Sequence, residues 1–417
     1  MKKVLLFVLS FVVLDISNAL ALPRFALKKG DITCGGCHAN PTGGGLRSEG
    51  GESFSVNQLP MWKRGETFTG HIASGITLGA DWRSQFLYFT QKQPASSGIG
   101  DTTLTTNTFH AMSYAIELGV QATKTLYGYL RYDPITPNPE AYAMLHIVHP
   151  SGELIEATDA VNDVYVKFGA FLPAFGIRFD DHTIYSKGGN ASISGFGSAG
   201  LFWGYGYRDV GAEAGIYLFD HLSVNVGLYN GNEGGSFQNF ATANTNKALC
   251  ARANLAGELI EDVLSGEIGG SFYSHQLTDG TGANAPSLSL FAIHGGLRAG
   301  PISVLAEFDN GKNVNTNNGL TYFPKATAMV FEGTVSITKG LDGLLRFETY
   351  ENKDISDNVQ TQVKSRITVG AQWFPLRFLE VRPEFRTATV EIPNSSNATL
   401  RDQLTQTTFL TQIHLFF

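Results

Sequence analysis

Two cysteines and a histidine near the start of the chain form the one arrangement in this sequence that could do chemistry. Cys34 and Cys37 are separated by two glycines, and His38 follows directly. Thiols at this spacing can form thioethers to the two vinyl groups of a haem, and the adjacent imidazole then serves as the proximal ligand of the iron. The sequence therefore predicts one covalently attached haem c, held by Cys34, Cys37 and His38.

Two other chemistries use paired cysteines, and the surrounding sequence favours neither. A zinc site would need further cysteine or histidine ligands nearby, whereas the third cysteine, Cys250, lies far along the chain. A redox disulfide normally belongs to a packed α/β unit, and the glycine-rich stretch 22–70 cannot form one. The distal ligand of the haem iron stays open between Met61, His71, another histidine and an unliganded position.

The first 21 residues have the pattern of a secretory signal peptide. Lys2 and Lys3 give a positive start, Val4–Leu14 is apolar, and Ala19–Ala21 offers a cleavage site of small residues. A membrane-spanning helix needs about 20 apolar residues, and this apolar stretch is shorter. We therefore expect cleavage after residue 21 and export of the mature chain from the cytoplasm.

The stretch from His71 to Phe417 alternates apolar and polar residues in short runs, which is the pattern of β-strands. In the run 209–218, the even-numbered positions hold Val, Ala, Ala, Ile and Leu, while Asp and Glu fall on odd-numbered positions. Beyond residue 21 no apolar run is long enough for a membrane helix, so a membrane-spanning form must be a closed barrel. The last run alternates up to the terminal Phe417, which resembles the assembly signal of outer-membrane barrels.

Short turns and long loops alternate along this stretch, as they do in outer-membrane barrels. Seven short turns and eight long loops make fifteen connections and therefore sixteen strands, and an even number puts both termini on the periplasmic side. One strand, Gly176–Tyr185, is assigned partly because the number must be even. The turns lie near Lys124, Pro173, Asp220, Glu261, Gly300, Gly340 and Pro375, and the loops near 91–106, 134–160, 186–206, 230–246, 275–286, 310–323, 351–362 and 389–402.

The predicted fold class is all-β: a transmembrane antiparallel β-barrel of about sixteen strands, preceded by a short irregular haem-binding plug segment. We divide the chain into a signal peptide (1–21), a monohaem c-type cytochrome segment (22–70) and an outer-membrane β-barrel (71–417). The segment 22–70 is too short to enclose a haem by itself. Because the reduction potential of a haem depends on burial, we expect this segment to lie in the barrel lumen.

The amino-acid composition argues against some classes of binding partner. The formal net charge of −7, without any basic cluster, argues against nucleic acid as a partner. Only 16% of the residues are charged, and glycine and aromatic residues are abundant, which favours a β protein over a helical enzyme. A barrel of this kind would instead have outer-membrane lipid around it.

Three further features of the barrel sequence carry expectations. Arg178, Asp180 and His182 would share the lumen-facing side of the predicted strand, either as a haem-propionate or ion contact or, as we favour, as ordinary polar lining. The ladder of alternating charges Glu380, Arg382, Glu384 and Arg386 should pair with itself and its neighbours. Cys250 should be buried in a strand.

The order of these parts resembles a known family. Leu22-Pro-Arg-Phe-Ala-Leu27 precedes Cys34-Gly-Gly-Cys-His38-Ala-Asn-Pro-Thr-Gly-Gly-Gly45, and a barrel pattern follows. This chain resembles the outer-membrane monohaem cytochrome–porin fusions, which include the iron-oxidising outer-membrane cytochromes. The haem segment carries the resemblance at the level of a motif, and the barrel matches in pattern alone. The stretch 175–183 also looks like a segment of porin-like members, without a role that the resemblance assigns.

The resemblance implies electron transfer across the outer membrane. The partners would be a periplasmic electron-transfer protein and an extracellular donor or acceptor, with ferrous iron the leading candidate. Whether such a protein acts as an iron-oxidising enzyme stays open. The alternative is a solute porin whose haem-bearing segment is a sensor or a gate.

Overall fold

The computed structural model shows a β-barrel and an N-terminal segment that contacts the inner face of its wall. Residues 1–21, the predicted signal peptide, lie outside the described residues, as do Asp180 and His182. The described residues are 26–27, 34–62, 69–93, 102–135, 139–148, 163–179, 181, 183–189, 200–201, 207–218, 221–231, 246–261, 263–278, 284–315, 322–323, 325–353, 359–393 and 401–417.

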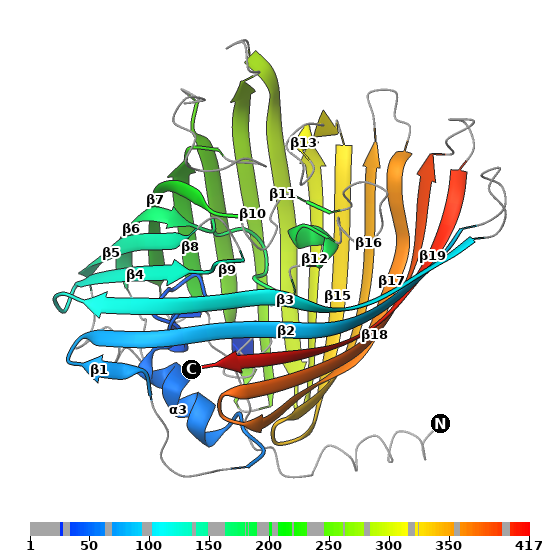
Figure 1. Cartoon of the computed structure of the whole chain (residues 1–417). Helices are drawn as coiled ribbons and strands as arrows, with labels where there is room; N and C mark the ends of the chain where they lie inside the picture. The colour runs from blue at the N-terminus through cyan, green and yellow to red at the C-terminus, as the bar shows by residue number, and fades with distance from the viewer. Residues whose placement is uncertain are drawn as a thin grey trace.

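Sixteen antiparallel strands close into a barrel, as the sequence predicted (Figure 1). The main sheet has a seventeenth member, the three-residue β1 (His71–Ala73), which pairs only with the start of β2. The ring closes where β19 pairs with β2, with Phe409 opposite Tyr88. The barrel strands are β2 (Ile76–Gln93), β3 (Thr102–Gln121), β4 (Leu126–Tyr132), β5 (Glu140–Val148), β6 (Val164–Phe171), β7 (Asp209–Leu218), β8 (Leu222–Tyr229), β9 (Ala248–Ile260), β10 (Leu264–Thr278), β11 (Asn284–Ala299), β12 (Ile302–Lys312), β15 (Lys325–Thr338), β16 (Leu341–Lys353), β17 (Val359–Leu376), β18 (Leu379–Pro393) and β19 (Arg401–Phe416).

The remaining elements are short. The helix α3 (Glu49–Asn57) lies at the end of the barrel that carries the short turns (Figure 1). Two 3-10 turns, η1 (Cys34–Gly36) and η3 (Tyr185–Lys187), and a small ladder between β13 (Val314–Asn315) and β14 (Tyr322–Phe323) complete the set. No helix among the described residues is long and apolar enough to cross a membrane.

The strand predicted at Gly176–Tyr185 is wrong, although the total of sixteen is right. These residues belong to the connection between β6 and β7, where 172–179 and 183–184 form no strand. The missing strand is β5, which falls inside the predicted loop 134–160 and pairs with both β4 and β6. The pattern concealed β5 because apolar side chains occupy the middle of both faces: Tyr142 and Met144 point inward, and Leu145 and Ile147 are exposed on the outside.

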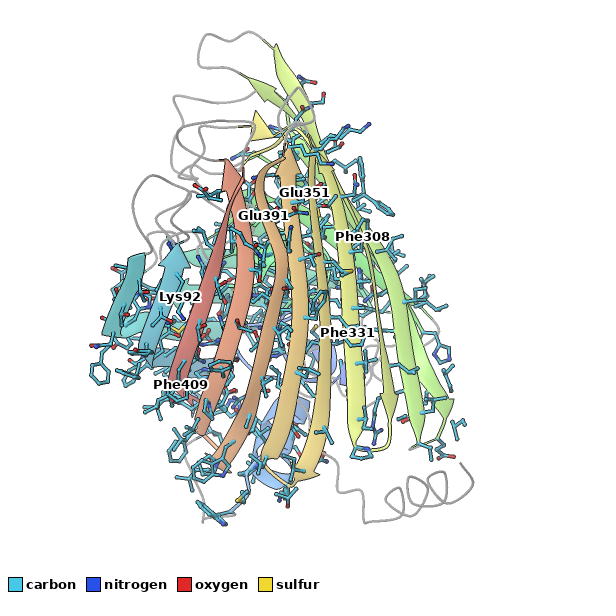
Figure 2. The ribbon with its side chains drawn as sticks, turned by 90° about the vertical axis from the view of Figure 1, so that its right-hand side faces the viewer. Lys92, Phe308, Phe331, Glu351, Glu391 and Phe409 are labelled. Atoms are coloured by element: carbon cyan, nitrogen blue, oxygen red, sulfur yellow. The ribbon has the colours of Figure 1, made fainter. Side chains whose placement is uncertain are left out.

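The outer face of the barrel is apolar and the inner face is polar. On β12, Ile302 and Phe308 are 52% and 45% exposed, whereas Glu307 and Asp309 between and beyond them are buried. Figure 2 shows Phe308, Phe331 and Phe409 on the outside of the wall, with Glu351 and Glu391 nearer its upper end. An apolar outer face over an inward polar face is the arrangement that lipid and a lumen require.

Ion pairs line the interior, and the predicted charge ladder is among them. Glu384 Oε2 accepts from Arg386 Nη2 at 2.5 Å, and Glu384 Oε1 forms an ion pair with Arg382 Nε at a distance of 3.1 Å. Glu380 accepts from Gln372 Nε2 at 2.7 Å and lies 2.9 Å from a ring nitrogen of His414. The prediction that the ladder pairs with itself and its neighbours is therefore confirmed. So is the burial of Cys250, which lies in β9 and is 2% exposed.

The position of the connections leads to a topology test in intact cells. Peptide tags inserted at 91–106 or 351–362 should be labelled from outside, because the connections β2–β3 and β16–β17 share the end that we expect to be extracellular. Tags near Lys124 or Gly340, at the opposite end, should be labelled only after the outer membrane is opened. Labelling in the reverse pattern would contradict the predicted orientation, and equal labelling of all four sites would contradict membrane insertion as a barrel.

Candidate functional site

A single tight turn brings the three motif residues together. Residues Cys34–Gly36 form the 3-10 turn η1, and the backbone N–H groups of Cys37 and His38 both donate to the carbonyl of Cys34, at 3.1 and 2.8 Å. This turn keeps both thiol-bearing residues and the imidazole on one short loop, as the haem chemistry of this spacing requires.

The helix α3 packs directly on this turn. Its N-cap is Ser48, whose hydroxyl accepts from Gly51 N at 3.3 Å and donates to the carbonyl of Gly36 at 3.0 Å. Glycine is required at positions 50 and 51, because a Cβ there would overlap the carbonyl oxygens of Gly36 and Cys37. A serine cap followed by two glycines thus fixes the helix against the motif.

The ring of His38 is oriented by the chain itself. Its Nδ1 lies 3.2 Å from the carbonyl oxygen of Gly45, and its backbone forms a bridge with Arg47. A ring whose Nδ1–H donates to a carbonyl presents Nε2 as the free lone pair, which is how metal-binding histidines are usually held. Burial, with Arg47 next in effect, lowers the pKa of His38 to about 4, so the ring is neutral at physiological pH.

Three consecutive glycines build the turn that carries the Gly45 carbonyl to this ring. Gly43, Gly44 and Gly45 have φ values of +91°, +76° and +73°, a region that other residues rarely adopt. The side-chain amide of Asn40 donates to the carbonyl of Gly43 at 3.0 Å and closes the turn. The glycine run therefore has a defined conformation here.

The barrel wall holds the motif segment through its inward side chains. Lys167 on β6 is fully buried; its Nζ lies 2.8 Å from Glu213 Oε1 and donates to Asn40 Oδ1 at 3.3 Å and to Thr42 Oγ1 at 3.2 Å. The hydroxyl of Tyr217 on β7 donates to the carbonyl of Pro41 at 3.1 Å. Because these side chains face inward, the segment 40–42 lies inside the barrel.

Other contacts of the same segment extend around the wall. The side chain of Leu46 packs against Gly79 on β2 and Gly119 on β3. The guanidinium of Arg47 lies 4.7 Å from the ring centroid of Phe416 on β19, and Glu52 pairs with Arg377 in the β17–β18 turn. We call residues 34–59 the plug, since they bond to strands on several sides of the lumen.

The two predicted distal ligands lie at separate places on the rim. The backbone N–H of Met61 donates to the carbonyl of Phe374 at 2.8 Å, which ties this residue to the end of β17. The His71 ring is exposed on β1, and its Nδ1 lies 3.1 Å from Thr77 Oγ1. The structure gathers Cys34, Cys37 and His38, and it gives neither Met61 nor His71 a hydrogen bond with them. The distal ligand stays a prediction.

The strand that would group Arg178 with Asp180 and His182 is not formed by the described residues 172–179, and Asp180 and His182 lie outside the described residues. Arg178 instead reaches the plug, where its Nη1 donates to the carbonyl of Gly43. The missed residue is Asp181, whose Oδ2 accepts from Arg346 Nη1 at 2.7 Å and from Arg386 Nη2 at 2.8 Å. Strand alternation could not reveal this, since the residue lies in a connection folded into the lumen.

The surroundings of His38 also offer groups suited to a bound anion. Among the described residues, Arg47 Nη1 and the Tyr127 hydroxyl are buried without a hydrogen-bond partner. Buried polar atoms are nearly always paired in proteins, so these two donors are open to a bound water or a ligand. Haem carries two propionates that accept hydrogen bonds, and the donors present fit them. Within the described part of the chain, no group of three or more His, Cys, Asp or Glu residues could hold a metal ion.

Comparisons with known proteins bear on the barrel. No family model and no curated protein matches this chain. Among solved structures, Pseudomonas putida OprB is 10% identical, covers 87% of this chain and 100% of its own, and has a TM-score of 0.54. An anion-selective porin from Comamonas acidovorans is 10% identical, covers 82% of this chain and 99% of its own, and has a TM-score of 0.50. At such identities the likeness shows the fold, which is that of a porin-type barrel.

Proposed function

We propose that this chain is an outer-membrane barrel of porin type that carries one haem c on its lumen plug and transfers electrons across the membrane. The observation that carries the proposal is the turn of Cys34, Cys37 and His38 inside the lumen, with the His38 ring oriented by Gly45. The electrons would pass between an extracellular donor or acceptor and a periplasmic electron-transfer protein. Ferrous iron is the leading candidate donor.

The proposed location rests on the sequence and on the barrel surface. The first 21 residues have the pattern of an export signal, and large apolar side chains are exposed on the outer face of the barrel. An apolar outer face stabilises a barrel in lipid and would be unfavourable in water. The even number of strands puts both termini on the same side, which we expect to be periplasmic, and the tag experiment tests this orientation.

Each residue of the site has a distinct part in the proposed mechanism. Cys34 and Cys37 would hold the cofactor through thioethers, and His38 would bind its iron through Nε2. The haem, when bound, supplies one-electron exchange. The Gly45 carbonyl holds the imidazole in one orientation, and the wall residues Lys167 and Tyr217 hold the plug inside the lumen. Since the hydrocarbon layer is about 30 Å thick, a site within the lumen would be nearer to the extracellular face than one held on the periplasmic side of the barrel.

A second candidate function is a solute channel whose haem-bearing segment is a sensor or a gate. The porin-type fold supports this candidate more directly than it supports electron transfer, because both solved neighbours reported above are barrels of that type. We favour electron transfer because the plug bonds to the wall on several sides, from Lys167 on β6 to Arg377 beyond β17. A plug bonded to several strands of the barrel wall leaves less of the lumen open to solutes.

The two candidates differ in what they transport across a liposome membrane. For the electron-transfer function, the full chain in liposomes should show rapid reduction of its haem in stopped-flow spectra when ferrous iron is added outside. The spectral change should be absent from a Cys34→Ala/Cys37→Ala variant. The same liposomes should admit small sugars slowly, at a rate that does not depend on the redox state of the haem.

The opposite result would favour the channel. If small solutes enter freely, if their flux is the same in Cys34→Ala, and if neither ferrous iron nor other one-electron donors reduce the haem from outside, electron transfer is contradicted.

A further inference from the structure

Three lysines lie side by side on the outer face of the barrel, at the end that we expect to be extracellular. Lys325 on β15 is directly opposite Lys353 on β16. The antiparallel pairing of β12 with β15, continued by one residue, places Lys312 opposite Lys325. Lys312 and Lys325 are exposed, and the side chain of Lys353 is 33% exposed. The strand residue next to each lysine is buried, so the alternation of the strands turns all three outward. We call Lys312, Lys325 and Lys353 the lysine row.

The lysine row lies just beyond the apolar band of the outer face. On β12 the outward positions run from Ile302 through Phe308 to Lys312, and on β15 they run from Phe331 to Lys325. In Figure 2, Glu351, which precedes the last lysine of the row by two residues, lies above Phe308 and Phe331, near the upper end of the wall. The row is therefore at the level where apolar side chains give way to polar ones, and lipid headgroups surround a barrel at this level.

Three cations in neighbouring positions repel one another. Side chains directly opposite each other on antiparallel strands have Cβ atoms about 5 Å apart, and like charges in such pairs are destabilising. Lys353 Nζ pairs with Glu351 Oε1 at 3.0 Å, and the other oxygen of this carboxylate accepts from Gln362 Nε2 at 3.0 Å. The sequence between Lys312 and Lys325 contains no aspartate or glutamate. An anion that contacts several ammonium groups of the row would stabilise this arrangement.

We propose that the lysine row binds the phosphate groups of the phosphorylated glycolipid that forms the outer leaflet of the outer membrane. Its acyl chains cover the apolar band, and its phosphates lie at the level of the lysines. Lysine binds phosphate as a point charge, and each lysine near an anionic lipid surface adds to the affinity. This inference rests on the predicted orientation of the barrel and does not require a haem. It can therefore fail while electron transfer stands, and the reverse is also true.

Binding of fluorescent lipid A to the full chain in detergent, measured by thermophoresis, tests the lysine row. Lys312→Gln/Lys325→Gln should weaken binding of bisphosphorylated lipid A about thirtyfold, the factor expected when two lysines near an anionic lipid surface are lost. The parent chain should bind dephosphorylated lipid A about tenfold less tightly, since only the acyl chains remain to hold it. Inorganic phosphate should not displace the lipid, because a free ion has no acyl chains to contact the apolar band.

A matched control separates the lysine row from the net charge of the barrel. Lys92 in β2 and Lys247 beside β9 are exposed lysines at the same end, several strands away from the row. Lys92→Gln/Lys247→Gln removes the same number of charges and should leave the affinity within about threefold of the parent.

Three results would overturn the proposal. Equal weakening by the two double variants would show an effect of net charge, and equal binding of phosphorylated and dephosphorylated lipid A would show that the phosphates are not bound. Displacement of the lipid by inorganic phosphate would show that the lysine row binds a free ion instead.

Discussion

A Cys34→Ala/Cys37→Ala variant should lose its covalent haem completely while the barrel still assembles. Both thioethers depend on these two sulfurs, and no strand of the barrel includes them. The parent chain should carry one c-type haem by its pyridine haemochrome spectrum and should stain for haem on a denaturing gel. The variant should show no stain. Barrel assembly is followed separately, by heat-modifiable migration on the gel.

The third cysteine provides the matched control for this result. Cys250 is buried in β9, and its Sγ donates to the carbonyl of Ala174 at 3.2 Å. Cys250→Ala should keep the full haem stain. Haem that remains bound after denaturation of the Cys34→Ala/Cys37→Ala variant would contradict the assignment of the motif.

The second large effect is expected at Lys167. Lys167→Met should lower the free energy of unfolding by about 3–5 kcal/mol, because it leaves the buried carboxylate of Glu213 without its cation. It also removes the donor that reaches Asn40 and Thr42, so the plug should become accessible to added protease. Urea titration of the full chain in detergent micelles measures the first change, and limited proteolysis measures the second.

Two further variants make this result specific. Lys364, near the start of β17, pairs with Glu391, and its side chain is 48% exposed, so Lys364→Met should lower the free energy of unfolding by no more than about 1 kcal/mol. Glu213→Gln combined with Lys167→Met should recover part of the lost stability, since no charge is then buried alone. Equal losses for Lys167→Met and Lys364→Met, with the plug still protected, would show that Lys167 does not anchor the plug.

The alternation of apolar and polar residues predicted the closed barrel, because the side chains of a wall strand face lipid and lumen in turn. The prediction was wrong where this alternation does not hold. In the middle of β5, Tyr142 and Met144 face the lumen and Leu145 faces outward, so the alternation is lost at the centre of this strand. Between β6 and β7 the described residues 172–179 form no strand, and Arg178, which we assigned to the polar face of a strand there, contacts the plug instead.

The site divides in the same way into local and distant parts. Cys34, Cys37 and His38 lie within five residues, so their grouping is visible in the sequence. The wall residues that hold them are far away: Lys167 is 127 positions from Asn40, and Tyr217 is 176 positions from Pro41. No periodicity links such positions, since the contact depends on which strands of the closed ring face the plug. The distal ligand stays a prediction for the same reason.

The pairing of β19 with β2 determines the order of events in biogenesis. The plug is made before any strand of the barrel, yet it bonds to strands on several sides of the lumen. A ring that closes through its first and last strands can close only when the last strand has arrived. In the proposed function, a catalyst that attaches haem at Cys34 and Cys37 would have to reach both thiols. We therefore expect haem attachment to precede closure of the barrel around the plug.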